Sequence, residues 1–322
     1  MNVNYLRISV TDRCNLRCVY CSPLGDCDFI GHEEILTFEE IQRLVGLLAE
    51  CGIRKVRLTG GEPLVRKGIA QLVRQLAAVS GVEEVSLTTN GVLLAQMAAE
   101  LKAAGARRVN ISVDSMDRAG YERITGFDRL PSVVEGIHKA IEVGLAPVRI
   151  NSVIVKGFND GPKQIAALAA MSIHLPVAVR FIEYCPTGTQ TRPASSYIPN
   201  SEVRRMIERE FGLLSPVLAG DIDGPAVYFK APNSAGTIGF ISGRSSLFCQ
   251  TCNRLRLTSD GKIRPCLYSA CSFDVKAMLR RGAGNEELLA FLKAIIHEKS
   301  RYTRLNSPGG QFEQFSMQSI GG

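Results

Sequence analysis

Several features that assign a chain to a cellular class are missing from this sequence of 322 residues. It has no run of about 18 or more apolar residues, which argues against a membrane span. The first residues, Met1 to Arg7, lack a cationic segment followed by an apolar stretch, so they do not resemble a secretory signal. These absences favour a cytoplasmic protein.

The sequence also lacks blocks of about five or more like charges, although its net charge is +7. The positive balance favours an anionic partner, either nucleic acid or a phosphorylated small molecule. Because the basic residues are spread along the chain, an ordinary solvated surface also explains the charge. The contents of 45% hydrophobic and 21% charged residues are typical of a globular enzyme.

Cysteine, by contrast, is abundant, and its positions are clustered. Disulfides are rare in the cytoplasm, so clustered cysteines there indicate metal binding or catalysis. The ten cysteines lie at positions 14, 18, 21, 27, 51, 185, 249, 252, 266 and 271. Because they concentrate near the start of the chain and between 249 and 271, we predict two separate metal sites.

Short β-type runs alternate with amphipathic helical runs between residue 5 and about residue 183. This alternation predicts a parallel sheet with helices outside. There are too few units for a closed eight-stranded barrel, so the expected fold is α/β, a partial (βα)6 barrel. The expected strands are 6–10, 55–59, 85–89, 109–113, 148–153 and 178–182.

Capping signals predict several helix ends. Thr37 with Glu40 forms a capping-box pattern, and Gly52 is a common stop; a second helix, 93–104, ends before Gly105. Beyond about residue 184 we expect one helix, 201–211, hairpin-like pieces and a polar tail. We therefore predict a barrel over residues 1–183 and a smaller C-terminal region over 184–322 that completes the active site.

Unusual residues follow the first three expected strands. The segment 12–21 follows the first strand, Gly60-Gly61-Glu62-Pro63 follows the second, and Asn90-Gly91 follows the third. Active sites of α/β proteins lie at the carboxyl ends of the strands. The pattern therefore predicts that these segments form the active site.

The first cysteine group, Cys14, Cys18 and Cys21, places three thiols on one short loop. Three thiolates can hold a [4Fe–4S] cluster and leave one iron open for S-adenosylmethionine (SAM). Zinc is the alternative, with Cys27 or His32 as a fourth ligand. The spacing is unusual for zinc, and we interpret Cys27 as a free thiol.

The second cysteine group is Cys249, Cys252 and Cys266. Arg254 and Arg256 lie between its members, and on a strand they share one face. Paired guanidiniums beside a metal suit an anionic ligand such as phosphate. The alternatives are a four-cysteine zinc site that includes Cys271, and a plain strand with two solvated arginines.

These motifs carry a family resemblance. The spacing of the first cysteine group, with Tyr20 before its last member, and the turn Gly60-Gly61-Glu62-Pro63 resemble the radical SAM signature. Together with segments 11–18, 32–37 and 252–257 and the ending Ile320-Gly321-Gly322, they resemble the GTP 3′,8-cyclase (MoaA) family. The resemblance runs from about residue 5 to the terminus.

The resemblance implies a lyase with two [4Fe–4S] clusters and SAM, acting on GTP in molybdenum-cofactor synthesis. Cleavage of SAM would give a 5′-deoxyadenosyl radical that removes the C3′ hydrogen of GTP, and C3′ would then bond to C8. Cys14, Cys18, Cys21, Arg254 and Arg256 would be catalytic, and both cysteine groups would bind metal. The residues implied to contact SAM are Tyr20, Gly60, Gly61, Glu62, Ser112 and Cys185. Those implied to contact GTP are Arg7, Arg57, Thr88, Arg149, Arg254, Leu255 and Arg256.

Two of these positions depart from the family pattern. Arg149 stands where a lysine is usual, and Cys185 stands where a methionine is usual. Apart from the resemblance, Arg7 and Arg57 stand out as charges within apolar strands, which need a partner such as a triphosphate or a structural ion pair. Without the resemblance, Thr88 and Ser112 would be interpreted as ordinary polar residues of a strand.

The resemblance also implies partners. They are GTP as substrate, a flavodoxin-like or similar reductant, and a cyclic pyranopterin monophosphate synthase (MoaC) that takes the product; a homodimer is left open, and neither membrane nor nucleic acid is expected. The terminal Gly321 and Gly322 would reach into the active site. The rival functions are another radical SAM enzyme with an auxiliary cluster acting on a peptide or RNA, and a non-catalytic zinc-binding module.

Overall fold

The computed structural model describes residues 2–21, 29–185, 194–217, 224–246, 248–269, 271–302 and 320. In the first half, strands alternate with helices as the sequence predicts. The strands are β1 (Tyr5–Ser9), β2 (Lys55–Thr59), β3 (Glu84–Thr89), β4 (Ala106–Ser112), β5 (Arg149–Ile154) and β6 (Ala178–Glu183). The helices are α1 (Phe38–Glu50), α2 (Ile69–Ala77), α3 (Leu94–Ala103), α4 (Arg118–Thr125), α5 (Leu130–Glu142) and α6 (Pro162–His174), with short 3-10 turns η1 (His32–Glu34) and η2 (Pro63–Val65).

The second half adds strands at both edges of the same sheet. Its strands are β7 (Ser215–Pro216), β8 (Val227–Lys230), β9 (Thr237–Ile241), β10 (Arg254–Leu257), β11 (Lys262–Arg264) and β12 (Phe273–Asp274). Its helices are α7 (Asn200–Phe211), α8 (Val275–Arg280) and α9 (Asn285–His297), with 3-10 turns η3 (Ala194–Ser196), η4 (Cys249–Thr251) and η5 (Lys299–Tyr302). Our expectation of one helix in this region is wrong, because α8 and α9 form there as well as α7.

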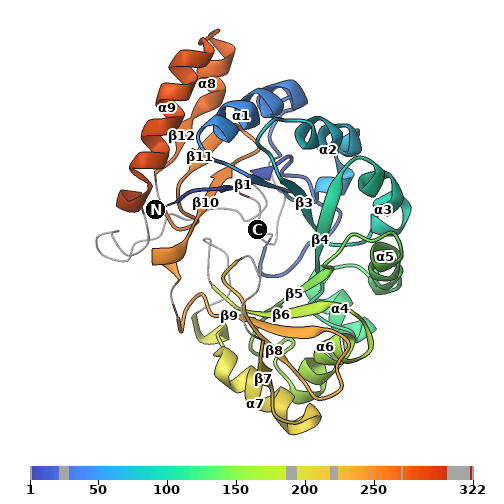
Figure 1. Cartoon of the computed structure of the whole chain (residues 1–322). Coiled ribbons are helices and arrows are strands. Elements are labelled where there is room, and N and C mark those ends of the chain that lie inside the picture. The colour runs from blue at the N-terminus through green and yellow to red at the C-terminus, as the bar shows by residue number, and fades with distance from the viewer. Residues whose placement is uncertain are drawn as a thin grey trace.

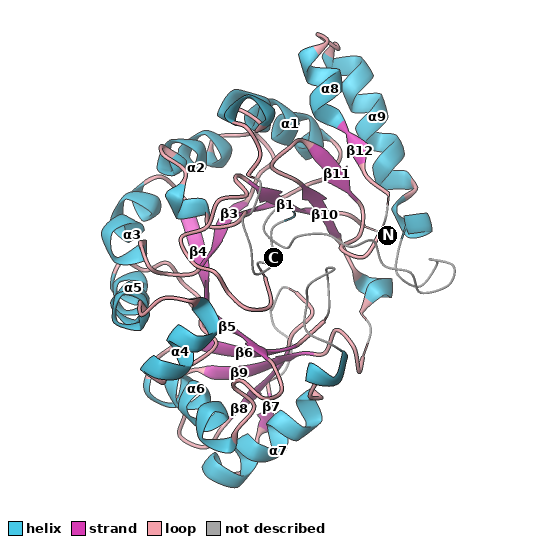
Figure 2. Cartoon of the chain, turned by 180° about the vertical axis from the view of Figure 1, so that it is seen from behind, coloured by secondary structure: helices cyan, strands magenta, loops and turns pink. Residues whose placement is uncertain are grey.

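The described strands form one sheet in the order β12-β11-β10-β1-β2-β3-β4-β5-β6-β9-β8-β7. Strands β1 to β6 are parallel, and the chain returns to add β10 parallel to β1 and β9 parallel to β6. The expected hairpin-like pieces are present as the antiparallel pairs β8–β9 and β10–β11. Figures 1 and 2 show from opposite sides that the sheet curves and that the helices cover its outer face. The α/β class with a parallel sheet is confirmed.

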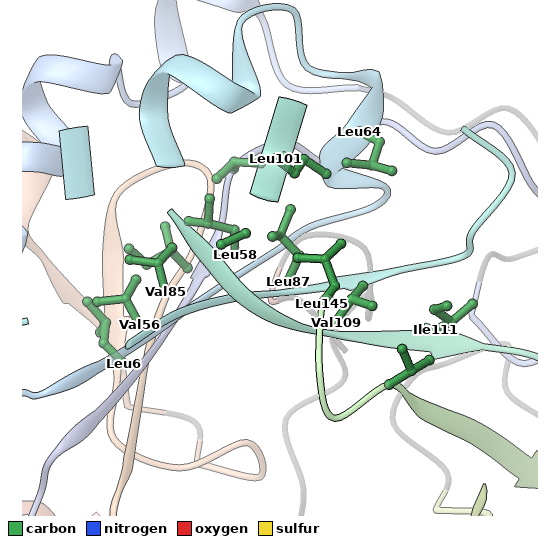
Figure 3. Packing of buried hydrophobic residues seen from close by; sticks show 14 of the residues in the cluster. Leu6, Val56, Leu58, Leu64, Val85, Leu87, Leu101, Val109, Ile111 and Leu145 are labelled. Carbon is green, nitrogen blue, oxygen red and sulfur yellow. The ribbon is translucent and has the colours of Figure 1, made fainter. Parts of the chain in front are cut away.

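Alternation along each strand sets the two faces of the sheet. In β2, Val56 and Leu58 are fully buried in the hydrophobic core, while Arg57 between them lies on the other face. The same period of two recurs in the neighbouring strands, and Figure 3 shows their apolar side chains gathered with Leu101 of α3. The helices therefore pack on an apolar face and leave a polar face inside the curve.

The predicted capping box is present at the start of α1. The Thr37 side chain accepts from the Glu40 backbone N–H at 3.2 Å, and the Glu40 carboxylate accepts from the Thr37 N–H at 2.8 Å. After α1, Gly52 adopts a φ of 101°, which suits glycine. Within the described part of the chain, no helix combines the length and apolarity that crossing a membrane requires.

Candidate active site

Arginine side chains form a row on the inner face of the sheet, which we call the arginine row. Parallel pairing puts Arg256 of β10 level with Arg7 of β1, and Arg7 level with Arg57 of β2. Arg57 and Arg256 are each only 7% exposed. Burial lowers the pKa of Arg7 well below its usual range, and the charge of Arg256 lowers it further. Cations that repel one another in a buried row favour an anionic ligand.

Two more buried arginines continue the positive charge across the sheet. Arg108 of β4 forms an ion pair with Glu84 at 2.7 Å. Arg149 of β5 is 4% exposed, and its pKa is lowered mainly by burial, with a further contribution from Arg108. The predicted substrate residue Arg149 therefore lies in the same cationic surroundings as the arginine row.

Arg180 of β6 is another buried arginine that lines the cavity on the inner face of the sheet, although we did not assign it a role from the sequence. Its Nε donates to Asn151 Oδ1 at 2.8 Å, and burial lowers its pKa to about 10. When the Asn110 carboxamide is turned so that its oxygen faces the guanidiniums, it accepts from Arg180 at 3.2 Å and from Arg57. The sequence did contain a signal for Arg180, because this residue, like Arg57, is a charge within an apolar strand.

The inner face encloses a cavity of about 340 Å³, the main cavity. Its volume falls within the range of roughly 300–1,000 Å³ that is usual for small-molecule sites. The structure brings nearly all of the predicted SAM and GTP residues together on its walls. These are Arg7, Tyr20, Arg57, Gly60, Gly61, Glu62, Thr88, Ser112, Arg149, Cys185, Arg254 and Arg256, together with the first cysteine group.

The first cysteine group is held by close contact with the glycine turn. The Gly61 N–H donates to the Thr11 carbonyl at 2.7 Å, and the Glu62 N–H donates to the Arg13 carbonyl at 2.8 Å. A Cβ at Gly61 would lie 2.3 Å from the Arg13 oxygen, which no real Cβ tolerates. A Cβ at Gly60 would lie 2.4 Å from the Thr11 oxygen, so both glycines are needed to bring β2 and the cysteine loop together.

Burial sets the ionisation of the first cysteine group. It raises the pKa of the Cys18 thiol well above the ordinary value, and Cys21 and Asp114 raise it further. Burial also raises the pKa of Cys14. A metal cluster would supply the positive charge that allows these thiols to ionise together.

Two buried carboxylates support the loops around this group. Glu62 accepts from the Thr89 hydroxyl and from the Asn90 N–H, each at 2.7 Å, and burial raises its pKa to about 7. Tyr20 donates its hydroxyl to Asp114, which also accepts from the Val153 N–H at 2.7 Å. Glu62 therefore ties the glycine turn to the end of β3, and Asp114 ties the cysteine loop to β5.

The second cysteine group lies around a smaller adjoining cavity of about 100 Å³, the side cavity. Cys249, Cys252 and Cys266 line it, and Arg254 and Arg256 line both cavities. Burial alone would raise the pKa of Cys252, but Arg254 and Lys299 outweigh burial and lower it below the ordinary value. The two cavities thus meet at the paired arginines.

Some predicted residues lie elsewhere. The Leu255 side chain is fully buried in the core behind β10 and does not line the main cavity. Cys271 is exposed and is not part of the side-cavity wall, so the four-cysteine zinc alternative gains no support. His32, in η1, lines neither cavity. Cys27, Gly321 and Gly322 fall outside the described residues.

The two cysteine groups differ from a site for a single metal ion. Across the described ranges, no set of three His, Cys, Asp or Glu side chains converges on one point as a single ion requires. A cubane cluster makes a different demand, since each thiolate binds a separate iron. At each group, three thiols line one cavity, which is compatible with that demand.

Comparison with known families gives two matches that cover most of the chain. The radical SAM superfamily model matches residues 8–169, and the model described as Molybdenum Cofactor Synthesis C matches residues 177–305. The first match begins within β1 and runs through β5, so it includes the first cysteine group. The chain is therefore of the radical SAM class, in which a protein-bound iron–sulfur cluster acts on SAM.

Relatives narrow this class to one family. A GTP 3′,8-cyclase from Pelotomaculum thermopropionicum is 45% identical over 99% of this chain and 98% of its own length. Another from Moorella thermoacetica is 46% identical over the same shares. This chain belongs to the GTP 3′,8-cyclase family.

Solved structures agree on the fold. Streptococcus suis SuiB bound to SAM superposes with a TM-score of 0.61 at 16% identity, covering 91% of this chain and 68% of SuiB. SuiB bound to its precursor peptide SuiA superposes with a TM-score of 0.53 at 21% identity, covering 65% and 45%. At this identity the likeness supports the fold alone.

Proposed function

We propose that this protein converts GTP to (8S)-3′,8-cyclo-7,8-dihydroguanosine 5′-triphosphate, the first step of molybdopterin biosynthesis. The observation that carries the proposal is that the main cavity joins the first cysteine group to the arginine row and meets, at Arg254 and Arg256, the side cavity that the second cysteine group lines. The relatives at about 45% identity are named for this reaction. The family resemblance and the chemistry of the cavity thus agree.

In the proposal, the arginine row binds the triphosphate. Arg57 and Arg256 are buried, Arg7 between them is partly buried, and all three lie level with one another and line the main cavity. Charge-assisted bonds from guanidinium to phosphate are about twice as strong as neutral hydrogen bonds. Arg149 keeps the charge at the position where lysine is usual, and Arg180 adds another donor that no sequence pattern had assigned.

SAM is proposed to lie at the opposite end of the cavity, against the glycine turn and Tyr20. Cys14, Cys18 and Cys21 would hold the cluster, and the bound cluster with SAM would supply the chemistry of hydrogen-atom removal. The chain's own contribution is to hold C3′ of GTP toward SAM and to exclude water. Positioning of this kind can lower the activation barrier by roughly 7–11 kcal/mol.

We propose one [4Fe–4S] cluster at each cysteine group, with residues 1–183 as the barrel and 184–322 as the region that completes the site. The electron donor is proposed to be flavodoxin-like, and a MoaC-type synthase to take the product, in the cytoplasm. The terminal Gly321 and Gly322 are proposed to reach toward the substrate. The nearest described residue, Ile320, is 1% exposed, which is compatible with a tail held inside the protein.

The test is turnover by anaerobically reconstituted protein with a reductant, SAM and GTP carrying deuterium at C3′. We expect an isomer of GTP that keeps its triphosphate, and 5′-deoxyadenosine that carries the deuterium. Removing Gly321 and Gly322 is expected to reduce the product and leave SAM binding intact. Unlabelled 5′-deoxyadenosine with unchanged GTP would contradict the proposal and favour a peptide or RNA substrate.

A further inference from the structure

Lys299 is buried beside the second cysteine group. It begins η5 and is only 1% exposed, although lysine is rarely buried without a partner. Its Nζ donates to the Pro265 carbonyl oxygen at 2.7 Å and lies 3.8 Å from the Cys252 sulfur. Because Pro265 directly precedes Cys266, this one ammonium contacts both segments that carry the group.

The charges around Lys299 are unusual for a buried lysine. Within the part of the chain that the structure describes, its two hydrogen-bond partners are the Pro265 carbonyl and the Cys252 sulfur, and no carboxylate forms an ion pair with it. Arg254 and Arg256 line the same cavity and add positive charge. A buried ammonium needs negative charge nearby, and metal-bound thiolates would provide it.

We propose that Lys299 is a positioning residue of the second cysteine group, which fixes Cys252 relative to Cys266 and offsets the negative charge of a thiolate-bound iron–sulfur cluster. The inference rests on the second cluster of the proposed function, and it assigns one more residue to the surroundings of that cluster. Outer partners of metal ligands orient those ligands, and their loss typically costs roughly 10–100-fold in metal affinity.

The same contact has a consequence for reduction. Hydrogen bonds to the sulfurs and nearby charge help to set the potential of an iron–sulfur cluster. Adding an electron makes the cluster more negative, and a fixed ammonium stabilises that form more than the oxidised one. Lys299 therefore holds the reduction potential of the second cluster higher than an uncharged side chain would.

The experiment isolates the second cluster in a background in which Cys14, Cys18 and Cys21 are replaced by Ala. Lys299→Met removes the charge, Lys299→Gln keeps a donor without charge, and Lys299→Arg keeps the charge. Lys293→Met removes an exposed lysine from α9 of the same region and is the matched control. Iron and sulfide content, resistance to an iron chelator, and midpoint potential are measured, with thermal unfolding as a check of folding.

We expect Lys299→Met and Lys299→Gln to lose iron to the chelator about 10-fold or more readily, and to show a more negative potential. Lys299→Arg and Lys293→Met should keep the potential of the background. A background that binds no iron would overturn the second cluster, and Lys299's role with it. A loaded background in which both uncharged variants match it in chelator resistance and potential would overturn the role of Lys299 alone. If Lys299→Met does not fold, Lys299→Gln decides.

Discussion

The Asp114 carboxylate and the Tyr20 hydroxyl lie beside Cys18 of the first cysteine group, whereas Arg254 and Lys299 lie beside Cys252 of the second. The first group also has a cation near it, since Arg17 donates to the Cys14 carbonyl at 2.7 Å. Next to Cys18, burial and Asp114 raise the thiol pKa. Next to Cys252, Arg254 and Lys299 lower it despite burial. The carboxylate beside Cys18 suits a positively charged group, as the sulfonium of SAM is. The surroundings of Cys252 suit a negatively charged ligand, as GTP is, so the proposed function predicts that charge separates the two ligands.

The largest expected effect tests whether the first group depends on the glycine turn. Gly61→Ala places a Cβ 2.3 Å from the Arg13 carbonyl, so the cysteine loop must move. We expect the first cluster to be lost and the second to remain, measured as iron per chain and by electron paramagnetic resonance. Gly46→Ala, in α1 with no atom within 4 Å of the new Cβ, is the control. If both cysteine groups of Gly61→Ala still hold their full content of iron, the first group does not depend on the glycine turn.

A smaller effect tests whether the positive charge at the second cysteine group binds GTP and not SAM. Arg256→Ala and Arg254→Ala should each weaken GTP binding by roughly 1.5–3 kcal/mol, which is about 10-fold or more. SAM affinity should be unchanged, since the charge removed lies near the proposed GTP end. Anaerobic calorimetry with each ligand measures both. Arg281→Ala, which removes an exposed arginine paired with Glu287, is the control. Equal loss of SAM and GTP affinity would count against separation by charge.

The smallest effect concerns the thiols of the metal-free protein. The thiolate is the reactive form, so a lowered pKa gives Cys252 a larger reactive fraction near neutral pH. As pH rises, alkylation of Cys252 should reach half its maximal rate at a lower pH than alkylation of Cys18 or Cys51, whose pKa values burial raises. Mass spectrometry after iodoacetamide treatment follows each site. The reverse order would contradict the proposed electrostatic difference.

Local patterns were enough to predict much of this fold. All six strands of the first half are confirmed within a few residues. The signal is clearest in β1, β2 and β3, which alternate apolar and polar side chains as Val56, Arg57 and Leu58 do. The capping box at Thr37 and Glu40 is also confirmed. These signals are local, and a single sequence contains them in full.

The features that were missed depend on contacts between distant segments. Nothing near residue 254 indicates that β10 pairs with β1, which is what brings Arg256 level with Arg7. Lys299 lies in a polar stretch that is typical of a helix end, and only the fold reveals its burial beside Cys252. Arg180 was the exception, because its position within an apolar strand was a readable signal.

The central claim is that the two cysteine groups hold two clusters with different tasks. It is tested most directly by two triple variants, one with Cys14, Cys18 and Cys21 replaced by Ala and one with Cys249, Cys252 and Cys266 replaced. Iron, 5′-deoxyadenosine and cyclised nucleotide are measured under reducing, anaerobic conditions. We predict that each variant keeps one cluster, that the first forms no 5′-deoxyadenosine, and that the second forms it without cyclising GTP. Formation of 5′-deoxyadenosine by the first variant would contradict the account.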